Sequence, residues 1–469
     1  MTVKIHLGHV LDVLREMKAE SVHCVITSPP YWGLRDYGTP PQVWDGDPGC
    51  EHVWKDTTFV RNNDQTAGAK QRTNPGSIGR DTPVENAFCI KCNAWYGHLG
   101  LEPTPSLYVQ HLVEICREIK RVLRKDGTFW LNLGDSYAAN RTYQVHNTRG
   151  ASGHTYSRDM EVPLGLKPKD LIGIPWTVAL ALRDDGWWLR MDNIWAKGCS
   201  FGEQEVKCPH CKKKHTVRYS GSVMPESVRD RPTKGHEYVF LFSKSQRYYY
   251  NYYAVKEPNS ETTGRWGKYT GTKTADAQAE TGGRHGASSG IVNVQSKDEF
   301  TKKYYTQGRN VRSVWQINSA QFPEAHYAVF PEELVEHPIA ASTSDSGCCA
   351  ECEAPYKRAN VKREVEQQRE PAHVPGNTDT KVDSTGWKPT TEALNYDEPS
   401  CKCDVEDTIP CLVLDPFGGR GTTAVVADRH NCDCILIELG AKYAVMSKVY
   451  CKKAGIEDVA IISEKEEGD

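Results

Sequence analysis

The segment from Cys411 to Lys453 constrains the fold of this chain more than any other. An apolar stretch, Cys411 to Asp415, leads into a glycine-rich turn and then into helical apolar spacing from Gly421 to Arg429. A second apolar strand, Cys434 to Glu438, and a second helix, Ala441 to Lys453, follow. Strands that alternate with helices are typical of a largely parallel sheet covered by helices on both faces, so we predict an α/β fold.

The rest of the chain continues this alternation. Two short apolar strands, Val3 to His6 and Val22 to Ile26, flank an amphipathic helix from Val10 to Met17. Further helices are predicted at Leu107 to Arg124, Ile172 to Leu182 and Pro331 to Ala341, and further strands at Thr128 to Leu133, Trp187 to Trp195 and Tyr238 to Phe242.

Composition and charge limit the class of protein. Of the 469 residues 38% are hydrophobic, and the net charge of -3 argues against a uniformly basic surface. Any contact with a polyanion must therefore come from local basic patches. The sequence has no apolar run of the roughly 18 residues that span a bilayer, and its N-terminus lacks a signal-peptide core. We expect a cytoplasmic protein whose 17 cysteines are reduced.

The turn after Asp415 has the features of a cofactor site. Gly419 to Ala424 formally matches a dinucleotide fingerprint, and Glu438 ends the next strand, where an acceptor for a ribose diol belongs. These features alone leave NAD and other adenosine cofactors open. The carboxylate of Asp415 would repel a pyrophosphate but not a sulfonium amino acid, and the turn lacks the lysine of a phosphate-binding loop. The pattern favours S-adenosylmethionine.

A second candidate site follows the strand that begins at Val22. The sequence Ser28-Pro29-Pro30-Tyr31 lies just past its carboxyl end, the edge at which open α/β sheets bind ligands. The two prolines supply carbonyl acceptors and no backbone donor. Ser28 Oγ and a proline carbonyl could accept both hydrogens of an exocyclic base amine and localise its lone pair. Tyr31 offers a face on which a base swung out of the duplex could stack.

Together the two segments predict methyl transfer from S-adenosylmethionine to a base amino group, by direct attack of the amine. No nucleophilic cysteine adjoins Ser28 to Tyr31. The dipeptide Pro410-Cys411 begins an apolar strand and is more typical of core packing than of covalent catalysis. The predicted partner is double-stranded DNA.

At this point the chain resembles the permuted amino-methylating DNA methyltransferases, in which the catalytic tetrapeptide precedes the cofactor loop. Ser28-Pro29-Pro30-Tyr31 is similar to that tetrapeptide, and Asp415 to Thr423 to that loop. The resemblance implies a Rossmann-like, seven-stranded mixed sheet. It also implies cofactor contacts from a set of residues that comprises Phe330, Asp415, Phe417, Gly419, Gly421, Thr422 and Glu438.

The resemblance also bears on the target base. A serine at position 28 is similar to family members that modify cytosine N4, whereas adenine-N6 members more often carry an acid or amide there. The family usually has Gly-Asp after its first strand, but this chain has Gly8-His9, so one contact to the adenosine is not implied here. A cognate restriction endonuclease fits such a system, although no stable complex with it is implied.

Short-spaced cysteine pairs predict structural zinc. Each of two sets supplies four ligands as two pairs, the arrangement that a tetrahedral site needs, and the alternative is unrelated reduced cysteines. A third knuckle contains Cys208, His210, Cys211 and His215, with Cys199 as a further candidate ligand. The two complete sets are Cys50, His52, Cys89 and Cys92, and Cys349, Cys352, Cys401 and Cys403.

The domain organisation follows from these assignments. A catalytic half precedes a polar segment that could recognise the target or be mobile, and a cofactor-binding half follows it. Zinc knuckles interrupt both halves. The ranges are 1–255 with insertions at about 45–98 and 199–222, then 256–310, then 311–469 with an insertion at about 346–405.

Three other functions stay open. Adenine-N6 methylation needs the same geometry, because its target is also an exocyclic amine. A zinc-knuckle nucleic-acid-binding protein without activity would fit the cysteines, although Ser28, Tyr31, Asp415 and Glu438 are all intact. An NAD oxidoreductase is disfavoured by Asp415 at the turn.

Overall fold

The computed structural model describes residues 1–34, 37–54, 87–138, 166–197, 201–207, 211, 213–220, 228–257, 309–319, 331–360, 395–405 and 407–463. The chain divides into two compact units. Unit 1 comprises Met1–Tyr250, Val311–Thr343 and Leu412–Asp469, and unit 2 comprises Asn251–Asn310 and Ser344–Cys411. Each unit is described by itself.

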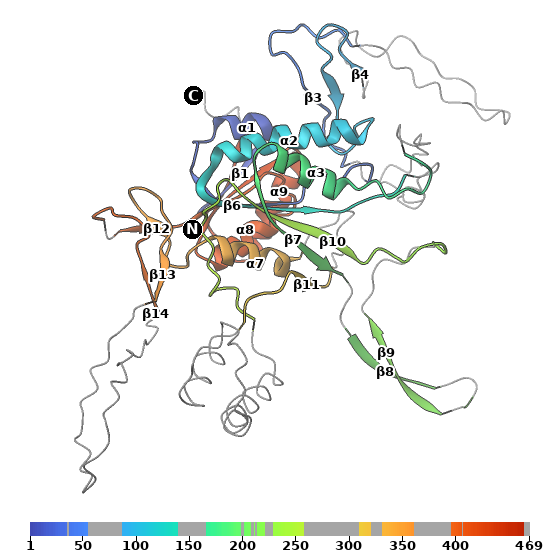
Figure 1. The fold of residues 1–469 in the computed structure, drawn as a ribbon. Coiled ribbons are helices and arrows are strands. Elements are labelled where there is room, and N and C mark those ends of the chain that lie inside the picture. Colours follow the sequence, from blue (N-terminus) through green and yellow to red (C-terminus); the bar gives the residue numbers. More distant parts are fainter. Residues whose placement is uncertain are drawn as a thin grey trace, which may run out of the picture. The chain divides into compact units, whose positions relative to one another are not determined.

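Unit 1 is built on a nine-stranded mixed sheet (Figure 1). Its strands run parallel except β10, which is antiparallel to both of its neighbours. The spatial order is β11 (Val314–Gln316), β7 (Trp188–Ala196), β10 (His236–Ser243), β6 (Leu123–Leu133), β2 (Val22–Thr27), β16 (Leu412–Asp415), β17 (Asp433–Glu438), β1 (Val3–Leu7) and β18 (Val459–Ser463).

Helices cover both faces of this sheet, as the α/β prediction requires (Figure 1). One layer consists of α1 (Val10–Glu16), α2 (Pro105–Val122) and α3 (Ile174–Asp184). The other consists of α7 (Glu332–Ser342), α8 (Thr422–Arg429) and α9 (Ala441–Lys453). The mixed α/β fold is therefore confirmed, and the predicted helices and strands occur with ends that shift by a few residues.

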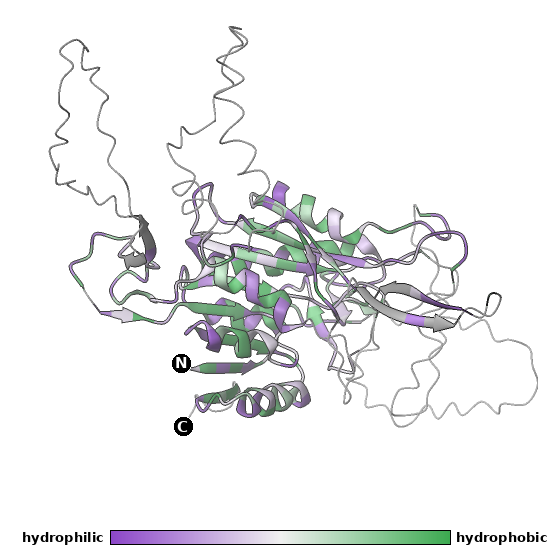
Figure 2. Ribbon diagram, turned by 90° about the horizontal axis from the view of Figure 1, so that it is seen from below, coloured by the Kyte–Doolittle hydropathy of each residue, from purple (hydrophilic) through white to green (hydrophobic). Residues whose placement is uncertain are grey.

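The strand count is corrected from seven to nine. The inner strands from β7 to β1 make up seven, and β11 and β18 add one at each edge. Sequence patterns did not predict these two edge strands. The strand β11 has only three residues, Val314–Gln316, and most residues of β18 are less buried than those of the central strands. Figure 2 shows that hydrophobic residues concentrate in the strands of the large sheet.

The long helix α2 illustrates how the sequence specifies its own ends. Thr104 caps its N-terminus by accepting a hydrogen bond from the backbone N–H of Leu107, and Pro105 occupies the first turn. Its buried stripe includes Leu112, Ile115 and Ile119, at helical spacing. Within the described part of the chain, no helix has both the length and the apolar character that spanning a bilayer requires.

Small sheets extend from both units. In unit 1, β3 (Gln42–Trp44), β5 (Trp95–Gly97) and β4 (Ala87–Phe88) form a three-stranded sheet, and β8 (Phe201–Lys207) pairs with β9 (Lys214–Ser220). In unit 2, β12 (Cys348–Cys349) pairs with β15 (Thr408–Ile409), and β13 (Lys357–Asn360) with β14 (Asn395–Glu398). Most of the predicted insertion 256–310 lies outside the described residues. The functional halves assigned to the chain stay a prediction.

Candidate functional site

The two segments singled out from the sequence meet at one edge of the sheet. Strands β2, β16 and β17 are adjacent and parallel, so their carboxyl ends lie at the same edge. Oγ1 of Thr27, the last residue of β2, donates a 2.6 Å hydrogen bond to Oδ1 of Asp415, the last residue of β16. Ser28 follows the first strand and the glycine-rich turn follows the second, which makes this edge the candidate site.

Asp415 organises the turn that follows it. Its side chain is buried, and besides Thr27 it accepts hydrogen bonds from Phe417 N at 3.1 Å and from Thr423 Oγ1 at 2.6 Å. Burial raises the pKa of this carboxyl above its ordinary value, and these donors oppose the rise. Because its oxygens accept hydrogen bonds from other groups of the protein, Asp415 fixes the conformation of the turn.

Glycines allow that turn to form. A Cβ at Gly418 would lie 2.8 Å from Cβ of Leu436, which is closer than atoms can pack. Gly421 precedes α8 with φ of 92°, a conformation that favours glycine. The next residue, Thr422, has a buried Oγ1 for which the described residues supply no partner.

Glu438 joins this turn to the end of β17. Its Oε2 accepts a hydrogen bond from Gly419 N and its Oε1 one from Gly440 N, both at 3.0 Å. Burial raises the pKa of Glu438 to about 7 although both backbone donors oppose the rise. The predicted ribose acceptor therefore lies beside the predicted glycine turn.

A polar network surrounds the predicted catalytic tetrapeptide, Ser28 to Tyr31. Ser28 Oγ donates to the hydroxyl of Tyr31 at 3.1 Å, and that hydroxyl donates to Oε2 of Glu237 at 2.9 Å. Asn132 Nδ2 also donates to the Tyr31 hydroxyl, at 2.9 Å. Lys197 forms an ion pair with Glu237. Since a carboxylate can only accept, Glu237 fixes the direction of the hydrogen bonds from Ser28 through Tyr31.

Sequence reasoning missed three of these residues. Asn132 lies on β6, Glu237 on β10 and Lys197 directly after β7, so none adjoins the tetrapeptide in sequence. Asn132 Oδ1 is buried and has no hydrogen-bond partner among the described residues. A polar residue within the apolar run from Phe129 to Leu133 was the one signal that could have identified Asn132.

Residues of other elements support the loop that carries the tetrapeptide. The Tyr108 hydroxyl of α2 donates to the carbonyl of Pro30 at 2.8 Å, which leaves Pro29 as the candidate carbonyl for an incoming amine. Gly134 makes room for the ring of Tyr31, since a Cβ there would lie 2.7 Å from its Cε2. The tetrapeptide is therefore a supported loop rather than an ordinary extended turn.

His9 occupies the position where the family resemblance led us to look for an aspartate. Its Nε2 is buried and has no partner among the described residues, and its ring makes an edge contact with Trp44 at 4.7 Å between centroids. Burial lowers the pKa of His9 below its ordinary value, which favours the neutral ring.

The structure brings together both complete sets of predicted metal ligands. The ligand atoms of each set all lie within 4.8 Å of one another. In the third knuckle, Cys211 Sγ lies 2.9 Å from Nε2 of His215, but Cys199, Cys208 and His210 lie outside the described residues. Phe330, the remaining predicted cofactor contact, also lies outside them.

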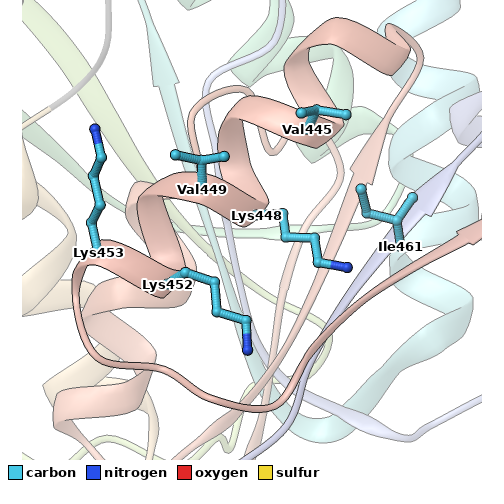
Figure 3. Close-up of a pocket in the computed structure, with 6 residues that line it drawn as sticks. All are labelled: Val445, Lys448, Val449, Lys452, Lys453 and Ile461. Atoms are coloured by element: carbon cyan, nitrogen blue, oxygen red, sulfur yellow. The ribbon is translucent and has the colours of Figure 1, made fainter.

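The structure also has a surface hollow of about 470 Å³ (Figure 3). It is lined by α9 and β18 and includes none of the predicted site residues. Its lining consists of Val445, Lys448, Val449, Lys452, Lys453 and Ile461.

The sheet with its single reversed strand, the glycine turn after a buried aspartate and the adjacent Ser-Pro-Pro-Tyr loop define a methyltransferase-type α/β protein. A family model described as DNA methylase, for N6 and N4 methylation, matches residues 22–350. The chain belongs to this amino-methyltransferase family.

Two Type II methyltransferases agree with that assignment. The Type II methyltransferase M.SmaI of Serratia marcescens is 28% identical over 95% of this chain and 89% of its own length. M.XycI of Xanthomonas campestris pv. cyanopsidis is 33% identical over 72% of this chain and 71% of its own. Among solved structures, a Thermus thermophilus protein described as a putative DNA modification methylase, complexed with S-adenosyl-L-methionine, aligns over 99% of both chains with 14% identity and a TM-score of 0.41.

Proposed function

We propose that this protein transfers a methyl group from S-adenosylmethionine to the exocyclic N4 amine of cytosine in double-stranded DNA. The observation that carries the proposal is the hydrogen bond between Thr27 and Asp415, which joins the amine-binding loop to the cofactor turn. The Type II names of the relatives support a role in a restriction-modification system.

The cofactor would bind over the carboxyl ends of β16 and β17. Glu438 would accept hydrogen bonds from the ribose hydroxyls, and the turn from Phe417 to Thr422 would lie against the rest of the molecule. The fixed backbone around Asp415 suits this role, because the oxygens of this carboxylate are already satisfied within the protein. Bound there, the cofactor supplies an electrophilic methyl group.

The target amine would enter beside Ser28. The hydroxyl hydrogen of Ser28 is directed to Tyr31, so its lone pairs are available to accept one amine hydrogen. The Pro29 carbonyl would accept the other. With both hydrogens held in this way, the amine lone pair points at the methyl group. The unpartnered Oδ1 of Asn132 is a further buried acceptor near this position.

The same network offers a path for the proton that the amine must lose. Methyl transfer would form a bond between the amine nitrogen and the methyl carbon and break the carbon–sulfur bond of the cofactor, and the nitrogen would then have to release a proton. The hydrogen bonds run from Ser28 through Tyr31 to the carboxylate of Glu237, in the direction that such a transfer needs. Glu237 would hold the proton until solvent removes it.

Serine at position 28 supports cytosine over adenine, because the chain in this respect resembles family members that modify N4. The test is to incubate the protein with labelled S-adenosylmethionine and duplex DNA and to analyse the nucleosides by mass spectrometry. We expect N4-methylcytosine. N6-methyladenine would overturn the assignment of the base and leave the chemistry intact, whereas tight DNA binding without any product would overturn the enzymatic proposal.

A further inference from the structure

The cluster of Cys50, His52, Cys89 and Cys92 in unit 1 has the dimensions of a tetrahedral metal site. Cys50 Sγ lies 4.0 Å from Cys89 Sγ, and Cys92 Sγ lies 3.3 Å from Nδ1 of His52. Sulfur and nitrogen ligands at zinc distances would be roughly 3.5–3.8 Å apart. A disulfide needs a sulfur separation of about 2.05 Å, so the sulfur atoms are arranged for a shared ion.

The turn that holds two of these ligands is built for thiolates. Asn93 N donates to Cys89 O at 2.9 Å and Cys89 N to Ala94 O at 2.8 Å, which closes the turn tightly. Asn93 adopts a φ of 63° immediately after Cys92. Lys91 N points at Cys89 Sγ at 3.4 Å. A backbone N–H directed at sulfur stabilises its ionised form, which is the form that binds a metal.

Unit 2 contains an independent copy of this turn. Glu353 N donates to Cys349 O at 2.8 Å, Cys349 N donates to Ala354 O at 3.0 Å, and Glu353 has a φ of 58°. A glutamate in this left-handed conformation is strained and persists only where its surroundings fix it. The ligands Cys349, Cys352, Cys401 and Cys403 gather around this turn.

The ligand-bearing sheet in unit 1 is small. Its strands β3, β5 and β4 each span two or three residues. Backbone pairing over so few residues contributes little stability by itself, so the position of the sheet depends on the packing of its side chains and on any cross-link. Ile90 lies in the turn between Cys89 and Cys92. Its apolar side chain is 66% exposed, so this side chain does not anchor the turn in the core.

The same sheet clamps a buried histidine of α2. Trp44 on β3 and Trp95 on β5 stack on the ring of His111, with centroid distances of 4.8 and 5.4 Å. The ring nitrogens of His111 contact Asp45 Oδ2 at 3.0 Å and Glu102 Oε1 at 2.9 Å. All three rings are almost fully buried, so their packing depends on the position of the sheet.

Glu102 links His111 to the loop after Tyr31 through hydrogen bonds. Its Oε2 accepts a hydrogen bond from Gly100 N at 2.8 Å, and its backbone carbonyl accepts one from Nε1 of Trp32 at 3.0 Å. Gly33 N also donates to Gly100 O at 2.8 Å. Trp32 directly follows Tyr31, so a displacement of Glu102 would reach the tetrapeptide within one residue.

We propose that Cys50, His52, Cys89 and Cys92 bind a structural zinc ion, and that this ion holds the loop after Tyr31 in place through Trp44, Trp95, His111 and Glu102. Independently, Cys349, Cys352, Cys401 and Cys403 bind a second zinc ion in unit 2. Both sites are saturated with protein ligands, which is typical of structural and not of catalytic zinc. The positioning role rests on the proposed function, but the metal sites do not.

Elemental analysis of the full chain, purified without chelator, tests the metal sites directly. The wild-type protein should carry at least one zinc for each of the two clusters. The double variant Cys50→Ser/His52→Ala should lose one equivalent. The matched control Ile90→Ala, a substitution in the same turn at a residue that is not a ligand, should lose none. Wild-type protein without zinc, or a double variant with undiminished zinc, would overturn the proposal.

A conservative variant keeps the test decisive if the double variant does not fold. His52→Cys replaces a nitrogen ligand by sulfur, so it should retain its zinc. After exchange into cobalt(II), its sulfur-to-metal absorption should exceed that of the wild type. An unchanged cobalt spectrum would contradict ligation by His52.

Hydrogen exchange of residues 28–34 reads out the positioning role without any methylation assay. The double variant should exchange faster in this segment, and His52→Cys and Ile90→Ala should match the wild type. Loss of zinc with unchanged exchange in residues 28–34 would overturn the link to the catalytic loop.

Discussion

Oγ1 of Thr27 lies 2.6 Å from Oδ1 of Asp415, although 388 residues separate them in the sequence. The two residues end neighbouring parallel strands, so this contact fixes the spacing between the proposed amine-binding loop and the proposed cofactor turn. A hydrogen bond to a buried carboxylate contributes about 1.5–3 kcal/mol, which is enough to matter for both parts of the site.

Replacing Thr27 tests this contact. Thr27→Val keeps the shape of the side chain but leaves one oxygen of the buried Asp415 without its donor. We expect cofactor affinity to fall about ten- to hundredfold, in line with the loss of one such hydrogen bond. Thr27→Ser retains the hydroxyl and should bind nearly as the wild type does. Isothermal titration with S-adenosylmethionine measures both, and equal affinities for the valine and serine variants would contradict the role of this bond.

Asn132 should affect turnover and not cofactor binding. Asn132→Ala removes the donor to Tyr31 and a buried acceptor on the same side chain, so kcat should fall about ten- to hundredfold. Asn193→Ala is the matched control, because Asn193 is a buried amide of the sheet that donates to Val239 O. That variant should lose stability but retain its kcat. A similar kcat for Asn132→Ala and Asn193→Ala would show that only folding was perturbed.

Glu237 is the predicted end of the proton path. Glu237→Gln keeps the side-chain shape but removes the carboxylate that accepts from Tyr31 and pairs with Lys197. We expect methyl transfer to slow by roughly a hundredfold, within the range for a lost general base, while cofactor affinity stays unchanged. Single-turnover kinetics with bound cofactor separate this step from product release. Full activity in Glu237→Gln would remove Glu237 from the mechanism.

The raised pKa of Glu438 predicts pH-dependent cofactor binding. Its pKa is raised from 4.5 to about 7, so between these values the folded protein holds a proton that the unfolded chain releases. The contribution of this group to stability therefore falls as pH rises towards 7. Cofactor binding needs the carboxylate as acceptor, so affinity should rise up to about tenfold per pH unit below 7 and level off above it.

Glu438→Gln provides the control for this titration. The amide cannot ionise, so affinity should be lower and should no longer change with pH in this window. Binding measured on both proteins, from about pH 5.5 to about pH 8.5, would decide the matter. A wild-type affinity that does not vary with pH, or a glutamine variant with the wild-type profile, would contradict the assignment of Glu438 as the ribose acceptor.

The sequence predicted most of the sheet because its central strands are short apolar runs that end at recognisable turns. Asp415 and Glu438 were located from their positions at strand ends, and Ser28 and Tyr31 from the residue types beside them. Since β2, β16 and β17 are adjacent, residues chosen on local grounds fell at one edge. The structure brings these two distant segments together.

What the sequence could not provide was the set of neighbours that depend on strand order. Asn132 and Glu237 reach Tyr31 because β6 lies between β2 and β10 in the sheet. Nothing local distinguishes Glu237 from any other charged residue at the start of a strand. The hydrogen bonds that the Asp415 oxygens accept within the protein could not be predicted either, because Thr423 and Thr27 donate them from two different elements.

The central claim is that one edge of the sheet carries both the amine-binding loop and the cofactor turn, with separate duties. The most direct measurement is methyl transfer to duplex DNA by Ser28→Ala, alongside its affinity for S-adenosylmethionine. We predict a loss of kcat of about a hundredfold or more, with cofactor affinity unchanged within about threefold. Turnover at the wild-type level, or a parallel loss of cofactor binding, would contradict the claim.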